Sequence, residues 1–448
     1  MIDFKIKELK KYYQPFDTYR LFKDEKDTIF LDSSKEDKEL SKYSFIGVNP
    51  ICKFVSEGKT CFINGEKIES VDPFAILENL INEYKIDYKS DLPFVGGAIG
   101  YFSYDIGRVI EELPNTSTED FKIPDSIFLV YENIIIFDLH NKKTYISELG
   151  KLKGSTTKIE EKLGFYKEFN EVKVVESINT FHSNFDKQSY ENAVRKLKNY
   201  IRSGDIYIAN MTRGVMCENT ETAFNIYEKL RSINKAPFSA FMNFDEFQVV
   251  SSSPERFLSV ENKKVHTRPI KGTRPRGENP IEDLINKEEL SNSEKDKSEL
   301  LMIVDLERND LSKVCKPYSV KVNELFKIEE YATVFHLVSD IEGELQDNIS
   351  SIKCMKECFP GGSITGAPKI RAMEIIEELE GLKRNIYTGS IGYFDLRGNC
   401  DFNIVIRTIV KKDDKAYFGV GGGITWDSIE EAEWFETIDK AKALMRVL

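Results

Sequence analysis

Short motifs that combine glycine, proline and charged side chains follow one another through the second half of this chain, and they constrain its fold more than any other feature. Several contain glycine pairs or prolines that interrupt regular structure, and others place a charged residue inside an apolar run. An ordered set of motifs is far more specific than any one of them. The motifs lie at residues 253–256, 269–276, 302–310, 336–339, 360–369, 389–393, 406–408, 421–424 and 433–437.

Lys271 is the most informative residue of the series, because it lies on a loop directly before a glycine, in the run Pro-Ile-Lys-Gly-Thr. A lysine amine in such a place can act as a nucleophile. The alternative interpretation is that Lys271 only adds positive charge to a basic loop, since lysine commonly binds anions.

Size and charge limit the possible architectures and partners. A chain of 448 residues with 41% hydrophobic content exceeds the size of one typical core, so we expect one large two-lobed domain or two domains. The 75 acidic and 63 basic side chains are interspersed and give a net charge of −12, which argues against nucleic acid and anionic membranes as partners. An acidic protein that binds an anionic small molecule needs a local metal ion, arginines, lysines or helix N-termini.

The chain reads as a cytoplasmic protein with reduced thiols. Its first residues lack the apolar segment of a secretory signal, and the aliphatic run at 134–136 is far too short to span a bilayer. Seven scattered cysteines, an odd number, argue against a disulfide framework. Cys354 and Cys358 lie one helical turn apart without a second pair or a nearby histidine, so we expect buried helix residues rather than zinc ligands.

Residues 1–140 read as mostly β structure, with a strand over 60–63 that turns at Asn64-Gly65 and another over 134–137. Residues 141–184 are charged and weakly periodic, which predicts a linker with one helix.

The region from 185 onward begins with a predicted helix that Asp186 caps and Gly204 ends, followed by a strand over 205–211. A second helix is predicted after the loop at 360–368, with an apolar stripe at Ile370, Met373, Ile376 and Leu379 and an end at Gly381. Periodicity alone predicts only a mixture of α and β structure.

Taken together, the motifs resemble those of the chorismate-utilising enzymes, over nearly all of the C-terminal region and more loosely over the N-terminal one. The resemblance implies an α+β fold: a two-lobed, two-sheet β sandwich flanked by helices. It implies an N-terminal region at 1–140 like that of anthranilate synthase component I, a linker at 141–184, and a chorismate-binding catalytic domain at 185–448.

The family includes the large subunits of anthranilate synthase and aminodeoxychorismate synthase, and the isochorismate and salicylate synthases. An alanine at the place of Lys271 is typical of anthranilate synthase, whereas Pro-Ile-Lys-Gly-Thr resembles aminodeoxychorismate synthase component I. The resemblance thus implies amination of chorismate to 4-amino-4-deoxychorismate, the precursor of p-aminobenzoate for folate, through a covalent bond to Lys271. The alternatives are anthranilate synthase component I, for tryptophan synthesis, and a non-catalytic ligand-binding regulator on the same fold.

The resemblance assigns catalytic roles to three side chains. Lys271 would attack C2 of chorismate as a neutral amine, which Arg268, Arg274 and a metal ion nearby would favour. Glu255 matches the general acid that protonates the departing C4 hydroxyl, although an ion pair with Arg256 is the alternative. His336 matches a cleft histidine, although its apolar run would by itself indicate a structural histidine.

The resemblance also implies Mg²⁺, held by Glu299 and Glu436, with Asp296 and Glu433, each three residues upstream, acting more weakly through metal-bound water. Without the resemblance, these carboxylates would read as solvated helix faces. Arg407 and Lys440 match positions that bind the substrate carboxylates. The residues that match substrate-binding positions are Thr365, Tyr387, Arg407, Gly421, Gly422, Gly423 and Lys440.

The expected partners are chorismate, ammonia and a separate glutamine amidotransferase subunit, because no cysteine lies in the strand-to-helix turn that a glutaminase needs. Free ammonium should serve as a substrate at high concentration. Ile208 departs from the family pattern, because glutamine is common there and the isochorismate and salicylate synthases have a lysine base. Ser33 and Ser34 loosely resemble part of a tryptophan-binding motif and mark a candidate tryptophan pocket.

Overall fold

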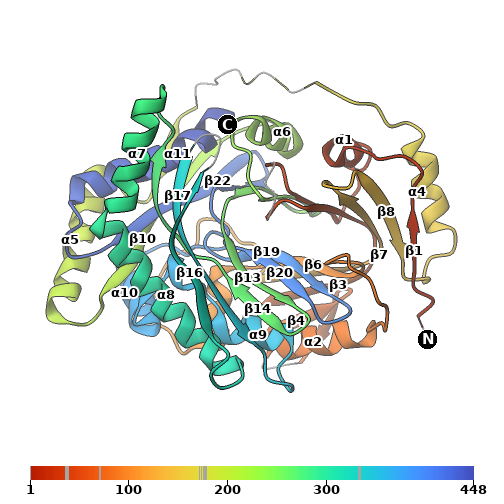
Figure 1. The fold of residues 1–448 in the computed structure, drawn as a ribbon, viewed down its shortest axis with the longest axis horizontal. Helices are drawn as coiled ribbons and strands as arrows, with labels where there is room; N and C mark the ends of the chain where they lie inside the picture. The colour runs from red at the N-terminus through yellow and green to blue at the C-terminus, as the bar shows by residue number, and fades with distance from the viewer. Residues whose placement is uncertain are drawn as a thin grey trace.

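The computed structural model describes residues 2–35, 40–69, 72–170, 172, 174, 179–330 and 334–448. It is a mixed α+β fold in which long antiparallel strands form a continuous, curved ladder with helices packed around it (Figure 1). The expected fold class is therefore confirmed.

The N-terminal part is built on two long strands, β3 (Tyr43–Glu57) and β7 (Ser126–Asp138), which pair along almost their whole length. Every residue of β7 is buried, so this strand lies between two layers. The predicted strand at 60–63 is β4 (Thr60–Ile63), and it turns into β5 (Glu66–Ile68). Asn64 and Gly65 have φ values of 52° and 84°, as a two-residue hairpin turn requires.

Strand pairing joins the two halves of the chain. β2 (Thr28–Asp32) pairs with β11 (Phe238–Asn243), and β6 (Gly97–Phe102) pairs with β19 (Ser390–Asp395). Within 141–184, β8 (Lys143–Glu148) also belongs to the ladder, because it pairs with β7 and β1 (Lys5–Glu8). The two halves therefore share continuous strand pairing.

The C-terminal part places helices against the ladder. β10 (Ile208–Glu218) pairs with β22 (Lys415–Ile424) from Ala209 to Glu218, and α11 (Glu430–Val447) packs on β22. α8 (Glu294–Val314) packs against β15 (Ile270–Pro275) and β17 (Val334–Glu344).

Helix signals in the sequence correspond closely to the structure. α5 (Lys187–Ser203) begins after Asp186, whose side chain accepts from the Ser189 N–H, and ends at Gly204 with φ of 83°. α10 (Lys369–Glu380) ends at Gly381, also left-handed. The predicted stripe on α10 is only partly right, because Ile370 is 45% exposed while Ile375 is fully buried.

The remaining helices and strands have the following bounds. They are α1 (Pro15–Tyr19), α2 (Pro73–Glu83), the 3-10 turn η1 (Tyr104–Ile106), α3 (Gly107–Ile110), α4 (Ser155–Leu163), β9 (Phe181–Ser183), α6 (Ala223–Ile233), β12 (Gln248–Ser253), β13 (Arg256–Glu261), β14 (Lys264–Thr267), α7 (Pro280–Asn292), β16 (Lys321–Glu330), α9 (Ser351–Cys358), the 3-10 turn η2 (Gly362–Ile364), β18 (Gly366–Ala367), β20 (Cys400–Asn403) and β21 (Thr408–Lys412).

All seven cysteines are buried and free, and Cys354 and Cys358 lie on α9 as predicted. Within the described ranges, no helix has the length and apolar character needed to cross a bilayer.

Candidate active site

Lys271 lies on β15, where the pairing with β17 shifts register between Ile270 and Thr273. The next residue, Gly272, has φ of 81°, and a Cβ there would stand 2.8 Å from Leu290 and 2.9 Å from Asp296. Only glycine therefore fits between β15 and the helices α7 and α8. This tight passage fixes the backbone that carries Lys271.

The Lys271 amine lies in the interior, where η2, β10, β22 and α8 come together. Its Nζ donates to the carbonyl oxygen of Ser363 at 3.0 Å. A Cβ placed on Gly423 would lie 3.4 Å from Ile208 Cδ1, 3.5 Å from Lys271 Nζ and 3.7 Å from Glu299 Oε2. The bare backbone of Gly423 thus faces an amine, a carboxylate and an apolar side chain at once.

Glu255 faces the same place from the turn between β12 and β13. Its side chain is only 6% exposed, and burial raises the pKa of its carboxyl, an effect that Lys271 partly offsets. Arg256 does not pair with it, because the guanidinium forms a bidentate ion pair with Asp401 at 2.9 Å. Glu255 is thus a buried carboxyl beside an amine, which suits a proton donor.

His336, on β17, is buried and hydrogen-bonded through Nδ1 to Thr273 Oγ1 at 2.9 Å. Burial, and then the positive charge of Arg407, lower the pKa of His336 to about 3. The imidazole is therefore neutral at neutral pH, and it can contribute hydrogen bonds rather than charge.

Arg407 is the best-placed receptor for a carboxylate. Its backbone has φ of 51°, its Nη1 donates to Asn234 Oδ1 at 3.3 Å, and burial lowers the pKa of its guanidinium. In the described part of the chain it forms no ion pair, so the guanidinium keeps donors for a ligand. Lys440, by contrast, is held by Glu436 at 2.7 Å and by the Gly421 carbonyl at 2.8 Å.

Each of the two arginines expected beside Lys271 forms an ion pair with a carboxylate. Arg268 pairs with Glu329, and Arg274 pairs with Glu289 at 2.9 Å and with Asp296 at 3.2 Å. Asp296 is therefore already engaged by a cation of β15.

The four predicted metal ligands lie on α8 and α11, and one amine stands between the two helices. Lys295 Nζ is 3.9 Å from Glu299 and 3.7 Å from Glu433. Glu433 and Glu436 both approach Gly422, because a Cβ there would stand 3.3 Å and 3.0 Å from their oxygens. Among the described residues, no three acidic, histidine or cysteine side chains lie close enough together to hold a metal ion.

The protonation of these carboxylates follows their surroundings. Burial raises the pKa of Glu299 and, together with the charge of Glu436, the pKa of Glu433. At Glu436 burial alone would raise the pKa of the carboxyl, but the positive charge of Lys440 holds that pKa below its usual value. Oε2 of Glu433 is buried and has no hydrogen-bond partner, so this oxygen could still accept a ligand.

Thr365 and Tyr387, two further residues predicted to bind substrate, lie in different surroundings. Thr365 is fully buried, and its hydroxyl bonds the carbonyls of Gly361 and Gly362, so it shapes the loop that presents Ser363. Burial raises the pKa of Tyr387, whose ring lies so close to Gly419 that a Cβ there would stand 2.3 Å from it.

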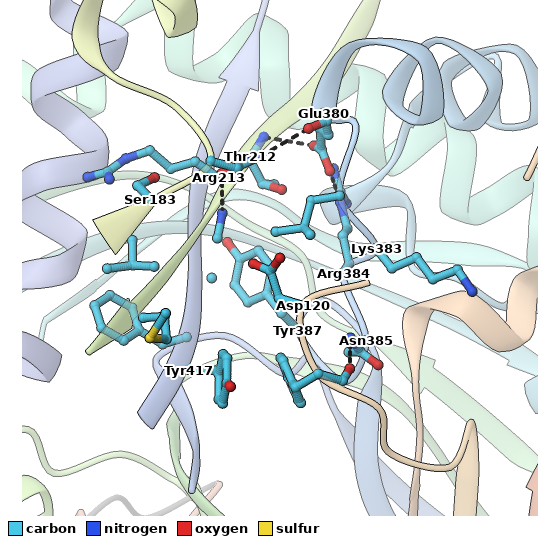
Figure 2. A pocket seen from close by; sticks show the side chains of 18 of the residues that line it. Asp120, Ser183, Thr212, Arg213, Glu380, Lys383, Arg384, Asn385, Tyr387 and Tyr417 are labelled. Carbon is cyan, nitrogen blue, oxygen red and sulfur yellow. Dashed lines mark hydrogen bonds and ion pairs between the residues drawn. The ribbon is translucent and has the colours of Figure 1, made fainter. Parts of the chain in front are cut away.

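Tyr387 also forms part of the wall of a pocket of about 290 Å³ (Figure 2). A buried ion pair, Glu380 with Arg384, lies on the same wall, and Arg384 also bonds the carbonyls of Asn210 and Ile364. Neither Lys271, Glu255 nor Glu299 lines this pocket. The pocket therefore does not contain the candidate site, and Tyr387 is the one predicted substrate-binding residue in its wall.

Ser33 lines a separate cavity of about 470 Å³, together with aromatic and charged side chains such as Phe45 and Arg268. Ser34 lies beside this cavity, and its hydroxyl bonds the Ala236 carbonyl and Ser239 instead.

Sequence reasoning missed Lys295 and Ser363 as members of the site. Lys295 lies four residues before Glu299 on α8, a spacing that could have revealed the pair. Ser363 acts through its backbone carbonyl, and no side-chain pattern could have indicated that.

Comparison with known proteins gives consistent results. Residues 26–446 match the family described as chorismate binding enzyme. The chain is 36% identical to aminodeoxychorismate synthase component 1 of Escherichia coli (strain K12), covering 94% of this chain and 93% of that protein. It is also 36% identical to anthranilate synthase component 1 of Lactococcus lactis, covering 99% of each. Anthranilate synthase component I of Streptococcus pneumoniae superposes with a TM-score of 0.82 at 33% identity, covering 92% of this chain and 93% of that one.

Proposed function

The chain belongs to the chorismate binding enzymes, and from that premise we propose that it is the chorismate-aminating component of an aminodeoxychorismate synthase. The proposed reaction converts chorismate and ammonia to 4-amino-4-deoxychorismate and water. The single observation that supports it is Lys271, whose amine enters the buried site next to Glu255 and Glu299.

The proposed chemistry proceeds in two displacements. The Lys271 amine forms a bond to C2 while the ring double bond shifts and the C4 oxygen leaves with a proton from Glu255. Ammonia then bonds to C4 and gives up a proton to the Glu255 carboxylate, the double bond shifts back, and the bond between C2 and Lys271 breaks to release the neutral amine. Ile208 beside the amine cannot activate water, which supports a nitrogen nucleophile over hydroxylation.

Charge complementarity supports an anionic substrate in this acidic chain. Arg407 offers donors for one carboxylate, and Lys440 on α11 donates to the Gly421 carbonyl of β22. Neutral His336 adds a hydrogen-bonding group without competing for the carboxylates.

Magnesium is part of the proposal. Mg²⁺ prefers carboxylate oxygens as ligands, and the side chains of Glu299, Glu433 and Glu436 supply them. The Oε2 atom of Glu433 has no hydrogen-bond partner, which fits a role as ligand. Bound Mg²⁺ would supply positive charge for a substrate carboxylate. Lys295 now provides positive charge between these carboxylates, so metal binding requires its amine to move.

Ammonia is proposed to come from a glutamine amidotransferase subunit. The chain itself would then use ammonium but not glutamine.

Anthranilate synthase is the second candidate, because relatives with that name match as closely over the full chain. The two reactions differ in the carbon that receives nitrogen. Lys271 favours C4, since a covalent bond at C2 blocks direct attack of ammonia there.

The decisive experiment incubates the purified chain with chorismate, Mg²⁺ and ammonium, and identifies the product by mass and by conversion to p-aminobenzoate with a lyase. We expect 4-amino-4-deoxychorismate. Direct formation of anthranilate would reject the proposal in favour of the second candidate.

A variant separates the nucleophile from a simple charge. Lys271→Ala should abolish amination at C4, whereas the control Lys264→Ala, at an exposed lysine on β14, should not. Undiminished C4 amination by Lys271→Ala would exclude the covalent route.

A further inference from the structure

Glu307 is a buried carboxyl for which neither the sequence nor the proposed reaction gives a role. It lies on α8, two turns beyond Glu299, and is only 6% exposed. A Cβ on Gly362 would stand 3.4 Å from Glu307 Cγ, so Glu307 lies directly beneath the loop whose next residue, Ser363, holds Lys271. Glu307 therefore forms part of the floor of the candidate site.

The hydrogen bonds around Glu307 locate a proton. Thr267 Oγ1 lies 2.7 Å from the Phe257 carbonyl oxygen and 2.8 Å from Glu307 Oε2. A hydroxyl has one hydrogen and can donate to only one of these oxygens. The Phe257 carbonyl can only accept, so a Thr267 hydroxyl turned toward Glu307 would leave two lone pairs facing each other at 2.7 Å. Both contacts are satisfied only if Thr267 donates to Phe257 and Glu307 donates to Thr267.

The charges around Glu307 agree with this arrangement. Glu255 faces it from the β12–β13 turn and Asp310 from its own helix, and both are acidic. Lys369, at the start of α10, is the nearby cation, but it is paired with Asp310 at 2.6 Å. Among the described residues no basic side chain forms an ion pair with Glu307, and burial first of all raises the pKa of its carboxyl to about 8.

We propose that Glu307 carries a proton at neutral pH and acts as a positioning residue, bracing the strand that follows Glu255 and keeping a second negative charge away from Lys271. As a neutral donor it bonds Thr267, which in turn bonds Phe257, two residues after Glu255. Ionised Glu307 would turn the Thr267 hydroxyl away from Phe257 and loosen this link. The role in catalysis rests on the proposed function, whereas the protonation state does not.

Infrared difference spectroscopy tests the protonation state directly. At pH 7, the spectrum of the full chain minus that of Glu307→Gln should contain the C=O band of a protonated carboxyl. The control is Asp305→Asn on the same helix, since Asp305 is 81% exposed and its difference spectrum should contain carboxylate bands and no band of a protonated carboxyl. Carboxylate bands in the Glu307 difference spectrum would overturn the inference.

Turnover with chorismate and ammonium tests the positioning role. Glu307→Gln retains a neutral donor and should keep the wild-type kcat at pH 7. Glu307→Leu removes the donor to Thr267 and should lower kcat about tenfold with little change in KM. Equal kcat values for Leu and wild type would refute the role. If no variant aminates chorismate, the proposed function fails, and the infrared result still decides the protonation of Glu307.

Discussion

The buried proton of Glu307 predicts a distinctive dependence of stability on pH. In the unfolded chain a glutamate ionises near its ordinary pKa of 4.5, whereas burial raises the pKa of folded Glu307 to about 8. Below pH 4.5 both states are protonated and the residue has no pH-dependent effect. Between the two values only the unfolded state loses its proton, so the wild type loses stability as pH rises, and above about pH 8 the loss is constant.

The magnitude follows from the width of that window. At about 1.4 kcal/mol per pKa unit, a shift of about 3.5 units corresponds to at most about 5 kcal/mol. Glu307→Gln lacks the ionisable group and escapes this loss. Its free energy of unfolding should therefore rise above that of the wild type by about 1.4 kcal/mol for each pH unit between about 5 and 8.

Urea denaturation, followed by the fluorescence of Trp426 and Trp434, measures this difference. Wild type, Glu307→Gln and the exposed control Asp305→Asn are compared at pH 5, 6, 7 and 8. The control should show only a small, flat difference, because its carboxyl is largely in solvent. A stability difference between Glu307→Gln and wild type that does not change over this range would refute the buried proton.

Three further outcomes test the rest of the site. Arg384→Met should cost about 3–5 kcal/mol in urea denaturation, because it leaves the buried Glu380 carboxylate without its partner, and a loss below about 1 kcal/mol would contradict this. Lys295→Gln should lower the melting temperature without Mg²⁺ by about 1 °C, because it removes the cation between facing carboxylates, and should gain more from added Mg²⁺ than the wild type does; equal gains measured by calorimetry would contradict it. Gly423→Ala should fold normally, since its Cβ makes only ordinary contacts, yet it should raise the KM for chorismate because the methyl group fills the space facing Lys271; an unchanged KM would place the substrate elsewhere.

Local signals in the sequence predicted elements well where each signal acts on its own neighbours. Asp186 and Gly204 mark both ends of α5, and Asn64-Gly65 forms the predicted turn. These signals work because a cap or a left-handed turn depends on backbone geometry within a few residues. α7 was not predicted, and its Ile281 side chain is 73% exposed, so no apolar stripe facing a core revealed it.

The candidate site was predictable in its side chains but not in their pairing. The motifs indicated Lys271, Glu255 and Arg407. In the structure Lys271 lies beside Gly423 of β22 and interacts with Glu255, whereas Arg407 bonds Asn234 and interacts with His336. Sequence could not show that Asp296 is engaged by Arg274, since the two lie on different elements that meet only in the folded chain. The approach of Lys295 to Glu433 was hidden for the same reason, whereas its pairing with Glu299 one helical turn away could have been predicted.

The motif at 302–310 forms the middle of α8. The helix carries Glu299 at its first turns and Glu307 two turns later, and the intervening buried residues Ile303 and Val304 keep one face against the core. A glutamate on an otherwise apolar stripe is costly unless it is neutral or paired. Under the two proposals above, α8 presents a metal-binding carboxylate at one end of the candidate site and a protonated one beneath the other end. The two glutamates lie about 12 Å apart along the helix axis, and under the proposed function that separation lets one rigid element serve both the anionic substrate and the amine.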